Sequence, residues 1–218
     1  MTFSITARCK DTGELGVAVT TAWFAVGSVC PAVRVGVGAV ASQALVNANL
    51  RAVCLGRIAN GATPELALAE ALEMDAAPEH RQVGLVDSDG RTAVHTGGAC
   101  PGESGHRIDG SCVIAGNTLS SIDVLDAMQT SWNDAADHDR PLADRLLSVL
   151  DAGQAAGGDA RGRQSAALLV GNADPMLQVD LRVDDHVEPL AEVRRLLALF
   201  RYKYEPIHRA LPTSVRSS

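Results

Sequence analysis

The sequence has few aromatic residues, no long apolar run and no cluster of basic residues, and each absence excludes a class of protein. Aromatic residues make up 3% of the 218 residues, so Ala, Val, Leu and Ile must form the core. No apolar run approaches the roughly 18 to 20 residues of a membrane-spanning helix. The formal net charge of −7 disfavours nucleic-acid binding, which requires clustered Lys and Arg. We therefore expect neither a nucleic-acid partner nor a membrane partner.

Cysteine usage and the first residues indicate a cytoplasmic protein. The five cysteines are odd in number and widely spaced, at positions 9, 30, 54, 100 and 112, and form no CxxC pair. This pattern argues against a disulfide framework and against structural zinc. No basic segment followed by an apolar stretch precedes the first predicted strand, so no secretory signal is predicted. We expect free thiols in a reducing cytoplasm.

The first 21 residues predict a β-hairpin. Apolar and polar residues alternate from residue 2 to residue 8, so Phe3 and Ile5 share one face of a strand while Thr2 and Ser4 share the other. A turn over residues 11–14 leads into a second strand over residues 15–21. The hydroxyl residue at position 2 therefore lies within a predicted strand.

Alternating runs and capping signals divide the rest of the chain. Helices are predicted at 48–60, 63–75, 121–133, 141–153 and 188–201. Further strands are predicted at 33–45, 112–119, 165–171 and 179–183, and a hairpin over 81–97 turns at Asp89-Gly90. Gly36 and Gly38 indicate a bulge or a close backbone approach. This order favours one α+β domain over residues 1–204, with antiparallel sheets and outer helices, and a loose tail over residues 205–218.

Four groups of polar residues at strand ends or in loops are candidate site residues. They are Thr2 with Ser4; Ser42 and Gln43 with Asn47; Gly116 with Asn117; and a charged set of Asp159, Arg161, Arg163, Gln164 and Ser165 with Asp180, Arg182, Asp184, Asp185 and His186. The charged set is typical of an ion network that joins two loops. Alternatively, its members orient a nucleophile and bind an acidic group of a substrate.

Familiar cofactor and metal motifs are missing. The six histidines show neither HxxxH nor HxH spacing, so no metal site is predicted. His95, at a strand end, either faces a cleft or has a structural role. There is no GxSxG elbow, no phosphate-binding GxxxxGK[ST] loop and no complete dinucleotide-binding glycine motif. We expect no cofactor, and a cysteine nucleophile at Cys30 or Cys100 is disfavoured because neither has a nearby His in sequence.

Several motifs together resemble a known family. They are MTFSI, GELGVAV, FAVGSVCP, GVGAVASQAL, RQVGLVD, HTG, GN, GGDARGRQSAALL and DLRVDDH, which span residues 2 to 200. They resemble an uncharacterised, mostly bacterial family within the N-terminal nucleophile (Ntn) hydrolase superfamily. Residues 47–55 lack the Tyr-Gly pattern expected there, so no substrate contact is carried over to that segment. The resemblance implies a four-layer αββα sandwich and hydrolysis of a C–N amide bond by the side chain of the first residue.

Applied to this chain, the resemblance implies that Thr2 is the nucleophile after removal of Met1, with its own α-amino group as the base. A free α-amino group has a pKa of about 7.7 to 8.0, which suits this role near neutral pH. Ser4, on the same strand face, is a rival nucleophile. Asn117 and a backbone N–H near Ser42 are expected to stabilise the oxyanion, and Asp159, Arg161 and Ser165 to orient the amine.

The expected substrate is a small amide. The arginines of the charged set suggest that it also carries a carboxylate. Its expected contacts are Ser42, Gln43, His95, Arg161, Arg163, Arg182, Asp184 and His186. We also expect a homo-oligomer. The alternative is a non-catalytic binding or assembly protein that retains the same sandwich, since a fold does not establish an activity.

Overall fold

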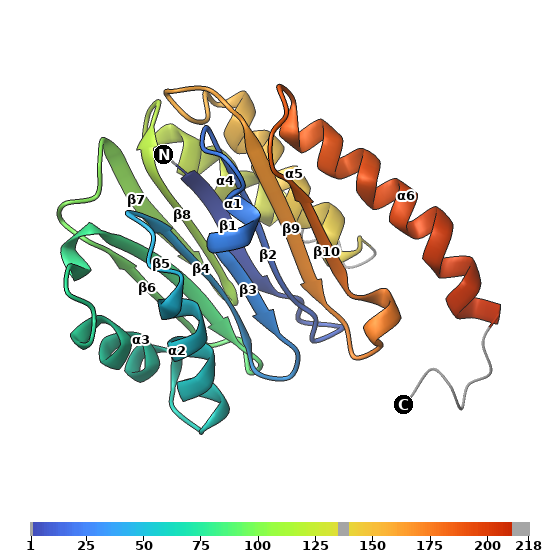
Figure 1. The fold of residues 1–218 in the computed structure, drawn as a ribbon, viewed down its shortest axis with the longest axis horizontal. Coiled ribbons are helices and arrows are strands. Elements are labelled where there is room, and N and C mark those ends of the chain that lie inside the picture. Colours follow the sequence, from blue (N-terminus) through green and yellow to red (C-terminus); the bar gives the residue numbers. More distant parts are fainter. Residues whose placement is uncertain (1, 135–139, 211–218) are drawn as a thin grey trace.

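The computed structural model describes residues 2–134 and 140–210. The chain forms two antiparallel β-sheets that pack on one another, and helices lie against each sheet (Figure 1). Six α-helices lie within the described residues. The α+β class predicted from the hairpins and paired helices is confirmed.

The larger sheet has six strands, and β1 lies inside it. Its order is β10 (Val179–Val183), β9 (Ser165–Gly171), β2 (Leu15–Thr21), β1 (Thr2–Arg8), β8 (Cys112–Leu119) and β7 (Glu103–Asp109). The helices packed on it are α4 (Asp123–Asp134), α5 (Leu142–Ala155) and α6 (Pro189–Ala210). Phe3 and Ile5 of β1 join Met128 of α4 and Leu146 of α5 in one buried cluster. This cluster fixes β1 from the helix side.

The smaller sheet has four strands, β3 (Pro31–Arg34), β4 (Gly38–Ala44), β5 (Arg81–Asp87) and β6 (Thr92–Thr96). Two helices, α2 (Asn49–Ala59) and α3 (Pro64–Glu73), pack on it, and Val40 and Leu85 join Cys54 of α2 and Leu68 of α3 in a second buried cluster. The Thr63 side chain accepts a hydrogen bond from the Leu66 N–H, so the predicted N-cap of α3 is confirmed. Shorter helical turns are α1 (Val26–Val29), η1 (Pro78–His80) and η2 (Pro175–Leu177).

The predicted alternation of β1 is confirmed, but its polar face is buried. Ser4 pairs with Val19 and Thr6 with Val17 across the β1–β2 ladder, and directly paired residues share a face. Val17 and Val19 pack with Ala39, Ala41 and Val86 of the smaller sheet. Thr2, Ser4 and Thr6 therefore face the contact between the two sheets.

The run at residues 33–45, predicted as one strand, is a hairpin instead. β3 ends at Arg34, Gly36 has a φ of 72° in the turn, and β4 begins at Gly38. A Cβ on Gly38 would lie 2.8 Å from the Val86 carbonyl oxygen. The close approach expected from the glycines therefore occurs at Gly38, while Gly36 supplies a left-handed turn.

Strand β7 was not predicted from the sequence, which there reads as a glycine-rich connection. The strand carries polar residues and lies at the edge of its sheet, where most of its side chains are half-buried. An edge strand with one neighbour needs no apolar alternation. The sequence of β7 therefore shows no apolar alternation from which a strand could be predicted.

The last helix is longer than predicted. We expected it to end near residue 201 and the chain to be loose from residue 205, but α6 continues to Ala210. The rings of Phe200 and Tyr204, one turn apart, lie 5.1 Å from each other, which supports the added turns. Residues 211–218 of the predicted tail lie outside the described residues. Across 2–134 and 140–210, no helix has both the length and the apolar character to span a membrane.

Candidate functional site

Four polar side chains form a row across one end of the six-stranded sheet. Thr2 of β1 pairs with Asn117 of β8 and with Thr21 of β2, and Thr21 pairs with Ser165 of β9. Because paired residues share a face, all four lie on the side of the smaller sheet. The Thr2 hydroxyl donates to the Thr21 hydroxyl oxygen at 3.2 Å. The register therefore places Thr2 in the middle of a polar row.

A buried amide network faces this row from the smaller sheet. The Oε1 atom of Gln82 accepts hydrogen bonds from Gln43 Nε2 at 2.8 Å and from Asn117 Nδ2 at 3.0 Å. Its own Nε2 donates to the Gly116 carbonyl at 2.9 Å. The Asn117 side chain is therefore held by a partner on the other sheet. Its Oδ1 atom is buried and has no hydrogen-bond partner within the described part of the chain.

Part of the polar row and of the amide network lines a cavity of about 880 Å³. Thr2, Gln43 and Asn117 contribute polar atoms to it. Residues 23–26 and 44–46 line it as well. Together with the adjoining residues 22 and 47, we call these segments the aromatic rim (residues 22–26, with Trp23 and Phe24) and the aliphatic rim (residues 44–47, with Leu45 and Val46). A pocket with apolar walls and a few convergent polar groups is typical of a small-molecule site.

The backbone of the aromatic rim is held by two side chains from the charged set. The Ser165 hydroxyl donates to the Trp23 carbonyl at 2.5 Å and accepts from the Val26 N–H at 3.1 Å. The Asp159 carboxylate accepts from the Ala22 N–H at 2.8 Å. Burial raises the pKa of Asp159, although its backbone donors partly oppose that shift. Ser165 and Asp159 therefore position the aromatic rim through hydrogen bonds to its backbone.

The aliphatic rim is held by an ion pair. The Arg81 guanidinium donates to both carboxylate oxygens of Asp75 at 2.9 to 3.1 Å and to the Leu45 carbonyl at 2.5 Å. Asn47 adds a bond to Asp75 at 2.6 Å. Hydrogen bonding from Arg81, the largest cause, lowers the pKa of Asp75 to about 2. Sequence analysis singled out Asn47 but neither member of the ion pair.

The cavity brings together five of the predicted site residues: Thr2, Ser42, Gln43, Asn117 and Arg161. The expected second oxyanion donor was a backbone N–H near Ser42; the N–H of Ser42 itself donates to the Cys30 carbonyl at 3.0 Å. Its hydroxyl donates to the Asn47 carbonyl. Both donors of Ser42 are therefore committed to the fold.

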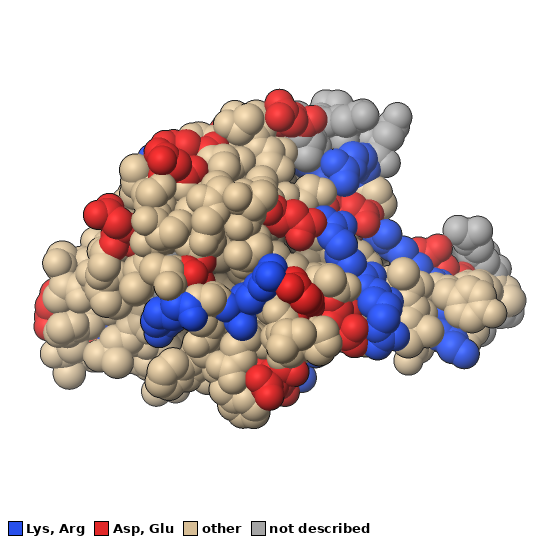
Figure 2. Space-filling model, turned by 90° about the horizontal axis from the view of Figure 1, so that it is seen from above, with Lys and Arg blue, Asp and Glu red and all other residues tan. Residues whose placement is uncertain are grey.

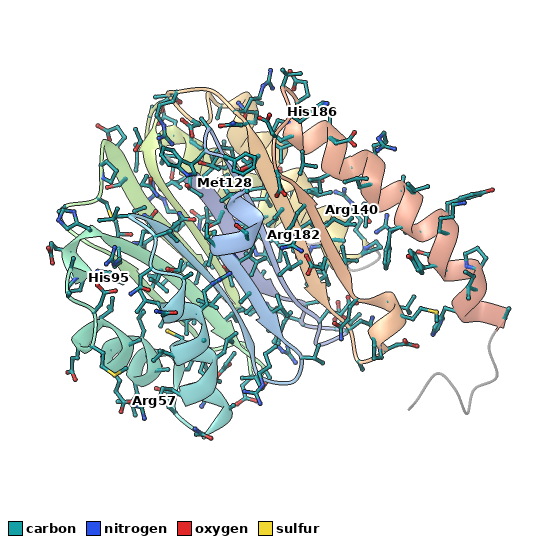
Figure 3. All side chains as sticks on the ribbon, in the orientation of Figure 1. Arg57, His95, Met128, Arg140, Arg182 and His186 are labelled. Carbon is teal, nitrogen blue, oxygen red and sulfur yellow. The ribbon has the colours of Figure 1, made fainter. Side chains whose placement is uncertain are left out.

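Other predicted site residues lie away from the cavity. Ser4, two residues after Thr2 on β1, is buried between the two sheets. His95 faces the Pro78 carbonyl at 2.8 Å, and Figure 3 shows it on the side of the smaller sheet, far from Arg182 and His186. None of these residues lines the cavity.

Most members of the charged set contact one another, the nearby backbone or Glu188. Arg163 pairs with Glu188 at 2.6 Å and Arg182 with Asp180 at 3.5 Å. The His186 ring accepts from the Glu188 N–H, and the Asp184 carbonyl accepts from the Ala25 N–H. Of these contacts, Arg182–Asp180 is an ion pair within the set and lies inside β10, so an ion network that joins the two loops stays a prediction.

Sequence analysis missed Thr21 and Gln82. Thr21 had a usable signal, because the hairpin register pairs it with Thr2. Gln82 had none, because its role depends on how the two sheets pack. Cys30 does line the cavity, but burial raises its pKa to about 12, which leaves almost no thiolate near neutral pH. A nucleophilic role for Cys30 is therefore disfavoured.

Comparison with known proteins identifies related sequences and structures. The model of the family of unknown function DUF1028 matches residues 2–193. The crystal structure of protein SPO2555 from Silicibacter pomeroyi, which carries the same family designation, has a TM-score of 0.89 and 29% identity over 100% of this chain and 97% of that one. Anbu (ancestral beta-subunit) from Yersinia bercovieri has a TM-score of 0.44 and 11% identity over 96% of this chain and 98% of that one. A search of curated proteins found no match.

Proposed function

Since the chain belongs to the DUF1028 family, whose function is unknown, we propose an activity from the site itself: hydrolysis of a C–N amide bond in a small molecule or short peptide. The proposed nucleophile is the hydroxyl of Thr2, exposed as the first residue once Met1 is removed. Met1 lies outside the described residues. The observation that carries the proposal is the position of Thr2, at the start of an inner strand and on the wall of the cavity.

The proposed reaction has two steps. The Thr2 oxygen forms a bond to the amide carbonyl carbon, the C–N bond breaks, and the hydroxyl proton passes through the α-amino group to the leaving amine. Water then attacks the resulting ester, the carboxylic acid leaves, and the Thr2 hydroxyl is restored. Nucleophile and base belong to one residue, so covalent geometry keeps them together.

Asn117 is the proposed polar partner of this chemistry. An amide nitrogen carries two N–H groups, and the bond to Gln82 uses one of them. The other is available for the developing oxyanion. The unpartnered Oδ1 atom has the right chemistry to accept from the free α-amino group of Thr2, its cross-strand neighbour. The network around Gln82 supports this role because it fixes the amide before substrate binds.

We also propose that the architecture is the four-layer αββα sandwich of Ntn hydrolases. The packing of helices on both sheets supports this proposal. Self-association is a further proposal, and light scattering tests it.

The test combines intact mass with three variants. Mass spectrometry of active protein should show loss of Met1. Thr2→Ala should lower turnover of an amide panel at least about a thousandfold, because the nucleophile is gone, whereas Thr2→Ser should retain part of it. Ser4→Ala is the matched control, a buried hydroxyl on the same strand face, and should keep activity near the parent level.

Two outcomes would contradict the mechanism. Retention of Met1 in active protein leaves Thr2 without a free amine, and full turnover by Thr2→Ala moves the nucleophile elsewhere. Binding of amides without turnover by the parent chain would favour the alternative of a non-catalytic binding protein.

A further inference from the structure

Two adjacent aromatic side chains stand exposed at the cavity beside Thr2. Trp23 is 66% exposed and Phe24 60% exposed, in a chain with two Trp, two Tyr and three Phe. Leu45 and Val46 of the aliphatic rim are exposed at 58% and 38%. Leaving large apolar side chains in water is unfavourable. A group of them around a cavity is typical of a surface that binds an apolar ligand.

The aromatic rim is preorganised rather than collapsed onto the cavity. Besides the bonds from Ser165 and Asp159, its Ala25 has a φ of 53°, a left-handed conformation that is uncommon for a residue other than glycine. The Ala25 N–H donates to the Asp184 carbonyl at 3.0 Å. Such strain persists where surrounding contacts fix it. The structure therefore holds two aromatic rings in an exposed position at a conformational cost.

Few charged side chains line this cavity. Besides Cys30, two titratable side chains line it, and each has an acidic neighbour: Arg161 lies 3.3 Å from Asp159, and His80 lies 3.4 Å from Glu79. Arg163 does not line it. In Figure 2 many Lys and Arg side chains gather in a band to the right of centre, the side on which α6 lies in Figure 1. The polar atoms beside Thr2 are neutral amides and hydroxyls.

We propose that the cavity takes an uncharged amide that carries an aromatic or branched apolar group, with that group between the aromatic rim and the aliphatic rim and the amide toward Thr2 and Asn117. This departs from the carboxylate-bearing substrate considered on sequence grounds. The volume of about 880 Å³ lies within the roughly 300 to 1,000 Å³ of small-molecule pockets. The choice of scissile bond rests on the proposed function, whereas the binding of the apolar group does not.

Tryptophan fluorescence provides a direct test, because the chain has two tryptophans and Trp132 is buried beside the Arg145 guanidinium. The probe is N-benzylacetamide, compared with N-methylacetamide, which lacks the ring, and with succinamate, which carries a carboxylate. N-benzylacetamide should change the emission of Trp23 in a Trp132→Phe variant and leave emission unchanged in Trp23→Phe. It should bind at least about tenfold more tightly than either comparison compound.

Variants locate the binding by calorimetry, which does not depend on a tryptophan. Trp23→Ala and Phe24→Ala should each weaken N-benzylacetamide binding by roughly tenfold. Tyr202→Ala, which removes an exposed aromatic side chain of α6 away from the cavity, is the matched control and should bind like the parent. Unchanged binding in both rim variants, no binding by the parent at millimolar probe, or tighter binding of succinamate would each overturn the proposal.

The Thr2→Ala variant separates this inference from the proposed function. Binding of N-benzylacetamide by Thr2→Ala without turnover supports both. Binding with turnover by that variant contradicts the Thr2 mechanism and leaves the ligand class standing.

A second copy of the chain is the competing occupant. A dimer in light scattering that Trp23→Ala dissociates, with no probe binding by the monomer, would assign the aromatic rim to that contact and overturn the ligand class.

Discussion

The two rims of the cavity are held by buried carboxylates whose pKa values are shifted in opposite directions. Asp75, at the aliphatic rim, and Asp159, at the aromatic rim, have side chains that are 0% and 1% exposed. The pKa of Asp75 is lowered to about 2, mainly by hydrogen bonds from Arg81. The pKa of Asp159 is raised, mainly by desolvation. Burial alone therefore does not decide the protonation of a clamping carboxylate.

The difference lies in the arginine beside each carboxylate. Arg81 is 12% exposed and reaches Asp75 at 2.9 Å, while Arg161 is 42% exposed and reaches Asp159 at 3.3 Å. A short bidentate pair with a shielded guanidinium offsets desolvation, whereas a longer pair with an exposed partner is screened by solvent. The aliphatic rim thus depends on charge, and the aromatic rim depends more on the neutral bonds of Ser165.

The largest expected effect comes from breaking the ion pair of the aliphatic rim. Arg81→Met should lower the free energy of unfolding by about 3 kcal/mol, because it leaves the Asp75 carboxylate buried without its partner. Urea unfolding measures the change. Arg57→Met, which breaks the exposed pair with Glu70, should cost less than about 1 kcal/mol. Equal losses in the two variants would contradict the contrast.

Removing the neutral clamp of the aromatic rim should have a smaller effect. Ser165→Ala should cost about 2 kcal/mol, because the buried Val26 N–H and the Trp23 carbonyl lose their partner. It should also weaken ligand binding at Trp23. Ser148→Ala, in the middle of α5, should be within about 0.5 kcal/mol of the parent. A Ser165→Ala protein as stable as the parent would show that the aromatic rim is held by other contacts.

The two carboxylates should respond to pH with opposite signs. For Asp75 the folded pKa of about 2 is below the ordinary aspartate pKa of 3.8, so its stabilisation is present above pH 3.8 and is lost as the pH falls toward 2. The loss should be on the order of 1 to 2 kcal/mol after allowance for solvent screening. For Asp159 the folded pKa is raised, so its contribution becomes more favourable as the pH falls through that value.

Urea unfolding as a function of pH, with the parent and Asp75→Asn compared, isolates the first contribution. The acid loss should be reduced in Asp75→Asn by the amount that Asp75 supplies. The comparison of parent and Asp159→Asn should show a difference of opposite slope. The same slope for both differences would show that desolvation does not dominate at Asp159.

The smallest expected effect is the replacement of Asp159 itself. Asp159→Asn should change the free energy of unfolding by less than about 1 kcal/mol, since one hydrogen-bond acceptor is lost while an unfavourably buried charge is removed. Asp75→Asn, the equivalent change at the aliphatic rim, should cost more at neutral pH. Chemical denaturation of the two variants measures the difference. A larger cost for Asp159→Asn would reverse our assignment of the two clamps.

Local patterns predicted much of the fold. The alternation of β1, the cap at Thr63 and the Asp-Gly turn before β6 depend on neighbours in the chain, and each is confirmed. The edge strand β7 and the last turns of α6 were missed. Both depend on contacts rather than on a repeating pattern. The same holds for the candidate site. Thr2, Gln43 and Asn117 were predicted because they are polar residues at strand ends, whereas no local pattern indicated Gln82 or Arg81.

The sequence by itself determined the α+β class and the alternation that sends the Thr2 side chain to the face opposite Phe3. These follow from the two-residue repeat of a strand and from short-range turn chemistry. Only the tertiary structure decided that this face is buried between two sheets, that Asn117 and Gln82 meet there, and that the two rims carry clamps of different kinds. The physical reason is that desolvation and hydrogen bonding depend on groups far apart in the chain, such as Ser165 and Trp23, which no local pattern brings together.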